Sequence, residues 1–436
     1  MIQTIDLRGT QLTAAELLAA VPRALTNVSV ASEIAAELIA DVRERGGQAL
    51  LDQAERLDRV RPDTIRVPQS HIDEALEGLS PAVRTAMEET IRRVRLASAA
   101  QVPPRVTTTI ADGAEITQRW QPINRVGLYV PGGKAVYPSS VVMNVVPAQV
   151  AGVASIALAS PPQAHFGGRV HPTILAVAGL LGVTEIYAMG GAGAIGAFAW
   201  GVHDIGLDPV QLVTGPGNVY VAAAKRLVRG QTGIDAEAGP TDILVIADNT
   251  SDPILVAADL VSQAEHDELA AAVLVTDSVE IADAVAERLA QLAQTTTHSE
   301  RVTAALGGTQ SALVLVDDLV AAAAFSNAFG PEHLEIQTSD PDAVLELIEN
   351  AGAIFLGPHS PVSLGDYAAG SNHVLPTGGQ ARFSSGLGAY TFLRPQQVIR
   401  YSRDALHAVA GHIDALSTAE ALPAHGDAIK ARFTVR

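Results

Sequence analysis

Cysteine is absent from the 436 residues of this chain. The protein can therefore form neither a disulfide nor a thiolate metal site, and no enzyme thiol is present to form a covalent adduct with an aldehyde. If the protein oxidises an aldehyde, the reaction must pass through a hydrated gem-diol. A metal site would have to use nitrogen and oxygen ligands, which favours zinc, manganese or a similar divalent ion.

Positive charge is scarce, with 29 Lys and Arg residues against 47 Asp and Glu residues and a net charge of −18. This balance argues against nucleic acid or an anionic membrane surface as a partner. The N-terminus lacks the basic and apolar regions of a signal peptide. The uncharged run 141–160 is interrupted by Asn, Pro, Gln and Gly, so it predicts a buried helix followed by a buried strand. We expect a cytoplasmic protein.

Aromatic residues are few (4%) although 48% of the chain is hydrophobic, a composition typical of an α/β protein with parallel strands. Residues 1 to about 100 are predicted to be helical, at 14–24, 30–46 and 81–100. From residue 125 strands and helices alternate, which predicts parallel sheets with helices on both faces. The predicted strands there are 125–130, 155–159, 185–189, 210–214, 243–247, 272–276, 312–316 and 353–356. Residues 357–388 read as a long functional loop, and the last fifty residues as a helical tail outside any sheet.

Two glycine-rich turns follow predicted strands. The loop Pro131-Gly132-Gly133-Lys134 precedes a helix, where backbone N–H groups can bind an anion, but it lacks the spacing of an ATPase P-loop. Gly191, Gly193 and Gly196 form a G-x-G-x-x-G pattern. The acidic residue expected about 20 positions later is missing, so a nucleotide would bind here without the usual Rossmann contacts.

The Gly330-Pro331 turn is followed by Glu332 and His333. Histidine can both take and give a proton near neutral pH, and a neighbouring carboxylate can activate a water or tune the imidazole. Adjacent residues point in different directions, so the pair suits two roles in one pocket. A solvated surface loop is the alternative interpretation of these two residues alone.

Candidate metal ligands occur in three places. Gln263 and His266 stand three residues apart on one face of a predicted helix end, and Asp366 and His425 offer further nitrogen and oxygen ligands. Sequence spacing alone does not bring these four residues together.

Seven motifs occur in one order along the chain: RVGLYVPGG (125–133), GPGNVYV (215–221), GIDAEAGP (233–240), SQAEH (262–266), GPEH (330–333), GD (365–366) and NHVLPT (372–377). Together they resemble the motifs of the histidinol dehydrogenase family over essentially the whole chain. The resemblance implies two sequential NAD-linked oxidations, of L-histidinol to L-histidinal and then to L-histidine, the final step of histidine biosynthesis. It also implies one zinc ion per subunit and a homodimer with shared active sites.

The fold expected from this resemblance has two incomplete Rossmann-like parallel-sheet domains, with a helical N-terminal segment and a helical C-terminal tail that swaps in the dimer. We expect the N-terminal segment at 1–26 and the first α/β domain, with the metal and catalytic residues, at 27–128 and 243–383. The second α/β domain, on the NAD side, is expected at 129–242, and the tail that reaches the partner subunit at 384–436.

The resemblance also assigns roles to residues. His333 would be the general base, and Glu332 would activate the water that hydrates the aldehyde. Zinc would be held by Gln263, His266, Asp366 and, from the partner subunit's tail, His425. The implied substrate contacts are Thr241, Gln263, His266, His333, Asp366, Glu420 and His425. The implied NAD contacts are Tyr129, Gly193 and Asn218.

Two departures from the family pattern stand out. Gly193 occupies a position where the family usually has Gln, which removes a side-chain hydrogen bond of about 0.5–1.5 kcal/mol and predicts weaker or rearranged NAD binding. Thr241 replaces a frequent Ser but keeps the hydroxyl group.

Two rival functions remain. One is a homologous NAD-dependent dehydrogenase of another polyol, such as a sulfopropanediol. Retention of Glu420 and His425, and the lack of added Arg or Lys near these loops, favour histidinol instead. The other is a non-catalytic metal- or nucleotide-binding regulatory protein, against which the Glu332-His333 pair argues.

Overall fold

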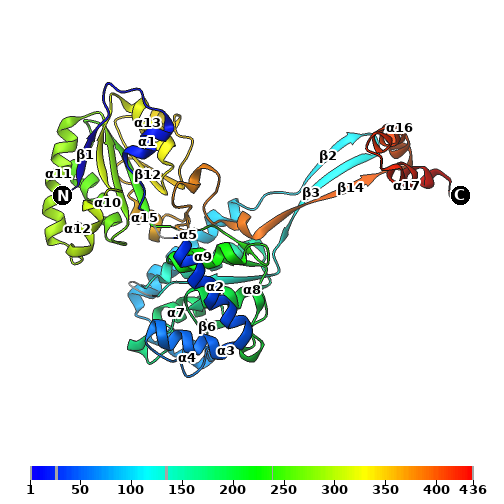
Figure 1. The fold of residues 1–436 in the computed structure, drawn as a ribbon, viewed down its shortest axis with the longest axis horizontal. Coiled ribbons are helices and arrows are strands. Elements are labelled where there is room, and N and C mark those ends of the chain that lie inside the picture. The colour runs from blue at the N-terminus through cyan, green and yellow to red at the C-terminus, as the bar shows by residue number, and fades with distance from the viewer. Residues whose placement is uncertain (1, 25–27, 133–135, 238, 435–436) are drawn as a thin grey trace. The chain divides into compact units, whose positions relative to one another are not determined.

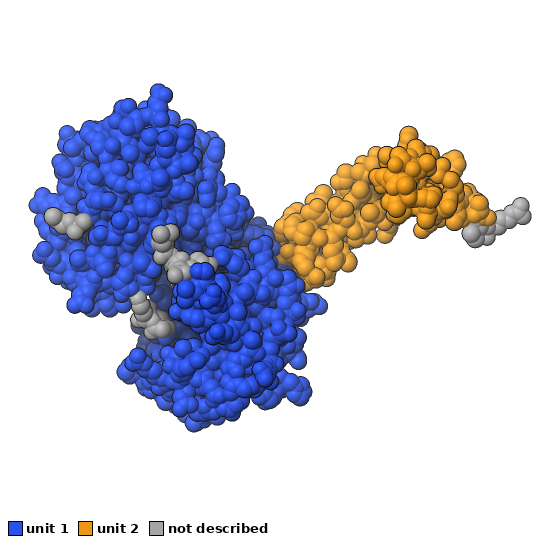
Figure 2. Space-filling model, viewed as in Figure 1, with its two compact units in different colours: residues 1–101, 123–392 blue, residues 102–122, 393–436 orange. Residues whose placement is uncertain are grey.

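The computed structural model describes residues 2–24, 28–132, 136–237 and 239–434. The chain forms two compact units, shown in different colours in Figure 2: residues 1–101 with 123–392, and residues 102–122 with 393–436. The domain boundaries predicted from the sequence stay predictions. In the described part of the chain, no helix is apolar over enough residues to cross a bilayer.

The first unit contains a six-stranded sheet in which every pair of neighbours is parallel. Its order is β1 (Gln3–Asp6), β11 (Ala312–Leu315), β10 (Ala271–Thr276), β9 (Asp242–Ala247), β12 (His333–Gln337) and β13 (Ala353–Leu356). Successive residues of a strand point to opposite faces, so alternate residues of β9 pack into two separate cores. One core includes α10 (Pro253–Ala264), α11 (Val279–Thr295) and α12 (Ser299–Gly307), and the other α1 (Ala14–Ala20), α13 (Leu319–Phe329) and α14 (Pro341–Leu345) (Figure 1).

The second sheet of this unit has five parallel strands. Its order is β6 (Ile186–Ala188), β5 (Ser155–Ser160), β4 (Arg125–Tyr129), β7 (Leu212–Thr214) and β8 (Gly233–Ile234). Residues of α2 (Val28–Arg45), α3 (Gly47–Gln53), α8 (Gly191–Trp200) and α9 (Val219–Val228) share one core with it. The run 141–160 forms the buried helix α6 (Pro138–Ala151) and the strand β5, as predicted.

Both sheets have the same order of five strands, with β9 and β4 in corresponding places. In each sheet three successive strands are added side by side in one direction. The fourth strand then pairs with the free side of the first strand, and the fifth follows it. This order is that of a Rossmann sheet without its sixth strand, which confirms the predicted pair of incomplete Rossmann-like sheets. The direction of travel reverses between β9 and β12 in one sheet and between β4 and β7 in the other. We call these places the switch points.

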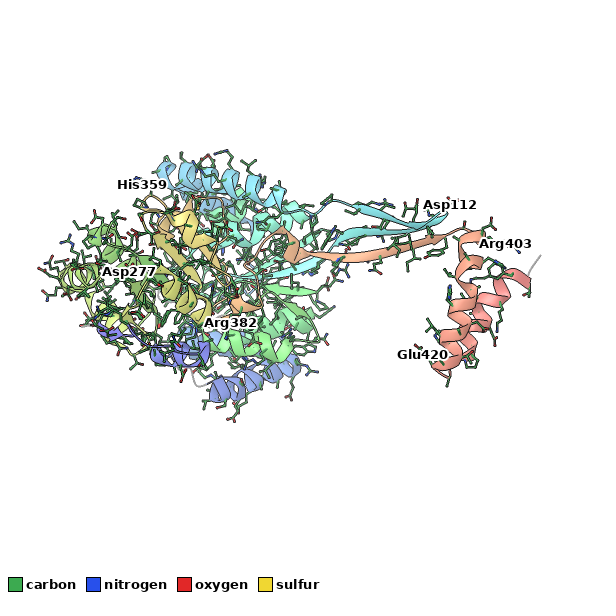
Figure 3. The ribbon with its side chains drawn as sticks, turned by 90° about the horizontal axis from the view of Figure 1, so that it is seen from above. Asp112, Asp277, His359, Arg382, Arg403 and Glu420 are labelled. Atoms are coloured by element: carbon green, nitrogen blue, oxygen red, sulfur yellow. The ribbon has the colours of Figure 1, made fainter. Side chains whose placement is uncertain are left out.

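The second unit consists of three antiparallel strands, β2 (Val106–Ala111), β3 (Ala114–Pro122) and β14 (Leu393–Tyr401), and two helices, α16 (Arg403–Ala419) and α17 (Pro423–Thr434). In Figure 3, Asp112 marks the turn between β2 and β3, and Arg403 and Glu420 mark the two ends of α16. Its buried residues, within the described chain, are Ala114, Thr117, Leu393, Ala405, Ser417 and Gly426. So small a set gives this unit very little core of its own.

Three local predictions are wrong. The N-terminal hundred residues are mostly helical, but they also contain β1, a four-residue edge strand too short to show a periodic pattern. The last fifty residues include β14, which is largely exposed and is held by pairing with β3 rather than by a buried face. The predicted strands include none between 316 and 353, whereas His333 begins the buried strand β12.

Candidate active site

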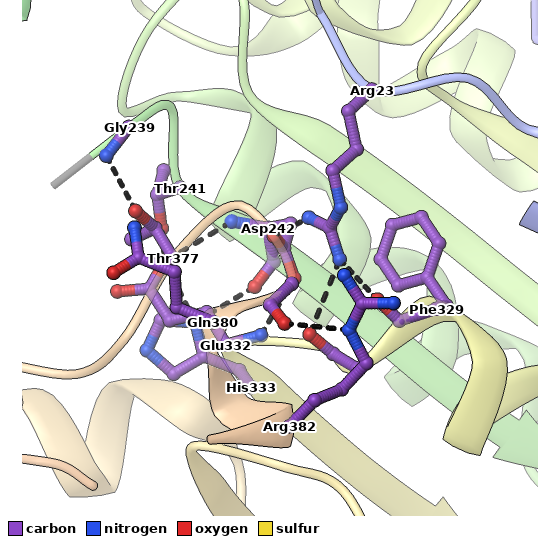
Figure 4. Close-up of polar contacts among 12 residues, drawn as sticks. Arg23, Gly239, Thr241, Asp242, Phe329, Glu332, His333, Thr377, Gln380 and Arg382 are labelled. Carbon is purple, nitrogen blue, oxygen red and sulfur yellow. Dashed lines mark hydrogen bonds and ion pairs between the residues drawn. The ribbon is translucent and has the colours of Figure 1, made fainter. Parts of the chain in front are cut away.

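The predicted acid–base pair lies at the amino end of β12, beside the amino end of the neighbouring strand β9 (Figure 4). Glu332 immediately precedes β12 and His333 begins it, while Thr241 precedes β9 and Asp242 begins it. The parallel pairing of β9 with β12 brings these residues together. Glu332 is 6% exposed, His333 5% and Asp242 1%, so the pair is buried rather than on a solvated surface.

Asp242 contacts both members of the pair. Its backbone oxygen lies 2.9 Å from Nδ1 of His333, and its carboxylate accepts a hydrogen bond from the Glu332 backbone N–H at 2.7 Å. Its own backbone N–H donates to Oε2 of Glu332 at 3.1 Å. Because a carbonyl oxygen can only accept, Nδ1 of His333 must carry the proton. Neutral His333 therefore has its basic lone pair on Nε2.

The carboxyl group of Glu332 is set for proton exchange near neutral pH. Its Oε2 also accepts a hydrogen bond from Thr241 Oγ1 at 2.5 Å. Burial is the main cause that raises the pKa of Glu332 to about 7, while nearby His333 and the bond from Thr241 act in the opposite direction. A carboxyl group with a pKa in this range can serve as a general base or acid at physiological pH.

Arg23 neutralises the buried charge of Asp242. Its guanidinium forms an ion pair with the Asp242 carboxylate, donates to the backbone oxygens of Phe329 and Gly330, and lies 4.1 Å over the Phe329 ring. Sequence patterns predict a role for neither Arg23 nor Asp242. The sequence could have indicated Asp242, since a carboxylate at the start of a strand that is otherwise apolar is unusual. No feature of the sequence indicates Arg23.

Gln263 and His266 lie at the end of α10, next to this pair. Gln263 Nε2 donates to Thr241 Oγ1 at 2.6 Å, whereas its buried Oε1 has no hydrogen-bond partner among the described residues. Burial lowers the pKa of His266, and the nearby charge of Asp366 acts in the opposite direction. A neutral imidazole and an unpartnered amide oxygen are both suited to bind a cation.

Asp366 lies in α15 (Val362–Tyr367), so the prediction of an uninterrupted loop at 357–388 is wrong. The backbone of Asp366 is contacted by a residue to which the sequence patterns assign no role. Nδ1 of the half-buried His373 lies 3.0 Å from the Asp366 backbone oxygen, and its Nε2 lies 2.9 Å from Ser140 Oγ. The carbonyl can only accept, so Nδ1–H donates to it and Nε2 accepts from the hydroxyl of Ser140. Burial lowers the pKa of His373. Nδ1 thus holds the backbone of Asp366, and the bond from Ser140 to Nε2 fixes the orientation of the His373 ring.

The predicted metal ligands are only partly brought together. Among residues 2–24, 28–132, 136–237 and 239–434, no three His, Asp or Glu side chains converge closely enough to hold an ion by themselves. The first unit supplies an amide, an imidazole and a carboxylate, from Gln263, His266 and Asp366. Glu420 and His425 belong to the second unit, where both are exposed, and their part in the site stays a prediction.

Two predicted nucleotide contacts lie at the switch point of the five-stranded sheet. Tyr129 ends β4, and Asn218 follows β7 and caps α9 by accepting from the backbone N–H groups of Tyr220 and Val221. Gly215 has a φ of +113° and lies against the backbone of Tyr129. A Cβ added to Gly215 would come within 2.0 Å of the Tyr129 backbone oxygen. Doubly wound sheets bind their ligands at such a place.

The third predicted contact, Gly193, lies in α8. An added Cβ there would come within 2.1 Å of Oε1 of Gln53, a buried side chain that donates to the Leu38 oxygen at 3.1 Å. The space beside Gly193 is therefore taken by Gln53, and the effect on NAD binding stays a prediction. Gly133 and Lys134 of the preceding glycine-rich loop lie outside the described residues.

Comparison with known proteins relates this chain to one family. The family model of histidinol dehydrogenase matches residues 21–433. The histidinol dehydrogenase of Leifsonia xyli subsp. xyli (strain CTCB07) is 69% identical over 435 residues, which cover 100% of each chain. That of Mycobacterium bovis is 58% identical over 436 residues, covering 99% of this chain and 98% of the relative. The crystal structure of histidinol dehydrogenase from Elizabethkingia anophelis superimposes with a TM-score of 0.93 at 31% identity, covering 99% of this chain and 98% of that one.

Proposed function

This chain belongs to the histidinol dehydrogenase family, and from that premise we propose that it oxidises L-histidinol through L-histidinal to L-histidine in two NAD-linked steps at one zinc-dependent site. The observation that supports this most directly is the arrangement at the amino ends of β9 and β12. There an imidazole with a basic Nε2 lies beside a buried carboxyl group whose pKa is raised to about 7.

His333 acts as the general base in this proposal. Its Nε2 takes the hydroxyl proton of the alcohol and, after releasing that proton, takes a hydroxyl proton of the hydrated aldehyde. NAD, when bound, accepts the hydride of each oxidation. Asp242 holds Nδ1–H throughout, which keeps the same ring nitrogen directed to both steps.

Glu332 serves the hydration between the two oxidations. Its carboxylate takes a proton from the water that adds to the aldehyde carbon, since the chain has no cysteine to form a covalent adduct. Thr241 and the Asp242 backbone hold one oxygen of this carboxylate by hydrogen bonds. Thr241 is also proposed to contact the substrate.

The residues of the metal site fit zinc. Gln263, His266 and Asp366 offer nitrogen and oxygen ligands, and the buried Oε1 of Gln263 is left unpartnered by the described protein groups. Zinc, when bound, supplies a fixed positive charge that orients the imidazole and amine of the substrate. A fourth ligand is needed to complete a four-coordinate shell, and we assign it to His425 of a second subunit.

The exposed apolar surface of the second unit supports the homodimer. Its large exposed apolar side chains include Val106, Ile110, Val398, Ile399, Leu416 and Leu422. A unit with this apolar surface and so few buried residues is stabilised when a second copy of the chain covers the surface. In the dimer we propose that each tail carries Glu420 and His425 to the other subunit's substrate and zinc. Tyr129, Gly193 and Asn218 are proposed to contact NAD in the same subunit as His333.

The test is turnover by zinc-loaded dimeric protein with histidinol and excess NAD+. We expect two NADH for each histidine formed, and the matched variant His333→Asn should form almost none. Oxidation of a sulfopropanediol but not of histidinol would favour the rival dehydrogenase. Binding of zinc and NAD without turnover of either substrate would favour a regulatory protein.

A further inference from the structure

A pair of carboxyl groups next to the site, the buried Glu335 and the half-buried Asp259, has no part in the mechanism above. Glu335, 1% exposed, stands two residues after His333 on β12, so both side chains point to the same face of the strand. Asp259 stands four residues before Gln263, one turn earlier on the same face of α10. Each carboxyl group thus belongs to an element that carries a proposed site residue.

The pair is joined to a third element, the helix α15 that carries Asp366. Oε1 of Glu335 accepts a hydrogen bond from the backbone N–H of Val362, the first residue of α15, at 2.9 Å. Gln337 Nε2 donates to Oε2 of Glu335 at 3.0 Å and to Asp259 Oδ2 at 3.2 Å. The buried side chain of Val362 also packs into the core that includes α10.

The directions of both pKa shifts favour one proton held between the two carboxyl groups at neutral pH. Burial, and next the charge of Asp259, raise the pKa of Glu335 to about 8, and burial also raises the pKa of Asp259. The protonated Glu335 donates to Asp259 and still accepts from Val362 through its other oxygen. A single proton thereby links β12 to α10, since two adjacent carboxylates with little access to water cannot both ionise cheaply. The hydrogen bond from Val362 links β12 to α15 in either protonation state of Glu335.

We propose that Glu335, paired with Asp259, is a positioning residue that holds α15 and α10 against β12, so that Asp366 and Gln263 meet at the zinc site beside His333. This rests on the proposed function, in which Asp366 and Gln263 are zinc ligands. A pair that only stabilised the fold would make no difference to zinc affinity in a folded protein.

Val362 allows the anchor to be removed without altering the carboxyl groups. Val362→Pro deletes the N–H donor at the first position of a helix, where proline is well tolerated, and the preceding Pro361 already has the extended backbone that proline requires (φ −69°, ψ 157°). Val362→Ala is the matched control, because it loses side-chain volume but keeps the N–H group.

The experiment measures the zinc dissociation constant of the dimer by competition with a chelator, together with kcat at saturating zinc and the thermal midpoint of unfolding. We expect Val362→Pro to weaken zinc binding about five- to tenfold relative to Val362→Ala. Glu335→Gln, which can still donate and accept, should stay within about twofold of the unmodified protein, whereas Glu335→Leu should resemble Val362→Pro.

Equal zinc affinity of Val362→Pro and Val362→Ala overturns the inference, even if Glu335→Leu does not fold. Asp366→Asn separates this result from failure of the proposed function. If Asp366→Asn leaves zinc affinity unchanged, the zinc assignment is wrong and the inference falls with it. If Asp366→Asn weakens zinc binding while the two Val362 variants agree, only the inference is wrong.

Discussion

The two parallel sheets share one strand order but place their candidate functional residues at opposite edges. In the five-stranded sheet, Tyr129 and Asn218 lie at the carboxyl ends of β4 and β7. In the six-stranded sheet, Glu332 and His333 lie at the amino end of β12, beside the amino end of β9. Under the proposed function, the same topology therefore serves two uses, with a different edge for each.

Hydrogen bonds at the other switch point explain the difference. After β9, the Asp248 carboxylate accepts from the backbone N–H of Thr250 at 2.9 Å and from both N–H and Oγ of Ser339, at 2.7 and 2.8 Å, beyond the end of β12. The crevice that usually binds a ligand is thus bridged by the protein's own groups. Topology indicates where a ligand can bind, and the side chains of the loops decide whether that place stays open.

The largest expected effect concerns the amino edge of the six-stranded sheet. His333→Asn should lower kcat for histidinol by about 10³-fold with little change in KM, because the base is lost while the other substrate contacts remain. Steady-state kinetics at saturating zinc measures both constants. A rise in KM alone would show that the base lies elsewhere.

The second effect concerns Glu332 and pH. With its pKa raised to about 7, Glu332 is ionised above that pH, so aldehyde oxidation should increase as pH rises through about 7. The folded protein favours the protonated form, so this group's contribution to the free energy of unfolding falls as pH rises from about 4.5 to about 7. Glu332→Gln should abolish the inflection and slow aldehyde oxidation about 10²-fold. Equal losses for alcohol and aldehyde would contradict its role in hydration.

A third prediction compares Asp242 with Asp248, one at each edge of the six-stranded sheet. Asp242→Ala removes a buried partner of Arg23 and the bond to the Glu332 N–H, and should lower both kcat and the free energy of unfolding, the latter by about 3 kcal/mol. Asp248→Ala should lower the free energy of unfolding by about 1–3 kcal/mol and leave kcat unchanged. Urea unfolding measures the free energy of unfolding of both variants, and steady-state kinetics at the same temperature measures kcat. A loss of kcat in Asp248→Ala would contradict the proposal that only the amino edge of this sheet serves catalysis.

The smallest effect is expected in the five-stranded sheet. Gly193→Ala brings a Cβ against Gln53 and should lower the free energy of unfolding by about 1–2 kcal/mol. The double variant Gly193→Ala with Gln53→Ala should lose less free energy of unfolding than the two single variants added together, because removing the Gln53 side chain relieves the clash. Additive losses would mean that these side chains do not interact.

Much of this molecule could be predicted from its sequence. Alternating strands and helices indicated the two parallel sheets, and the motifs indicated Glu332, His333 and Gln263. The strand β12 was not predicted, because the polar residues Glu335 and Gln337 interrupt its apolar pattern, and only the structure shows what they bind.

The contacts that no sequence pattern predicts are those between distant segments. Arg23 and Asp242 are 219 residues apart and pair only after the chain folds. Periodicity also cannot predict a strand such as β14, which is stabilised by its neighbour instead of a buried face. Such features depend on tertiary contacts, about which local residue preferences carry no information.

The hydroxyl of Thr241 has one more consequence. Gln263 donates to it, so its single hydrogen must point to Oε2 of Glu332, which also accepts from the Asp242 N–H. The two oxygens of this carboxylate are therefore chemically unequal. Oε2 already accepts two hydrogen bonds, so in the proposed hydration step the proton drawn from water settles on Oε1, which gives that step a fixed direction.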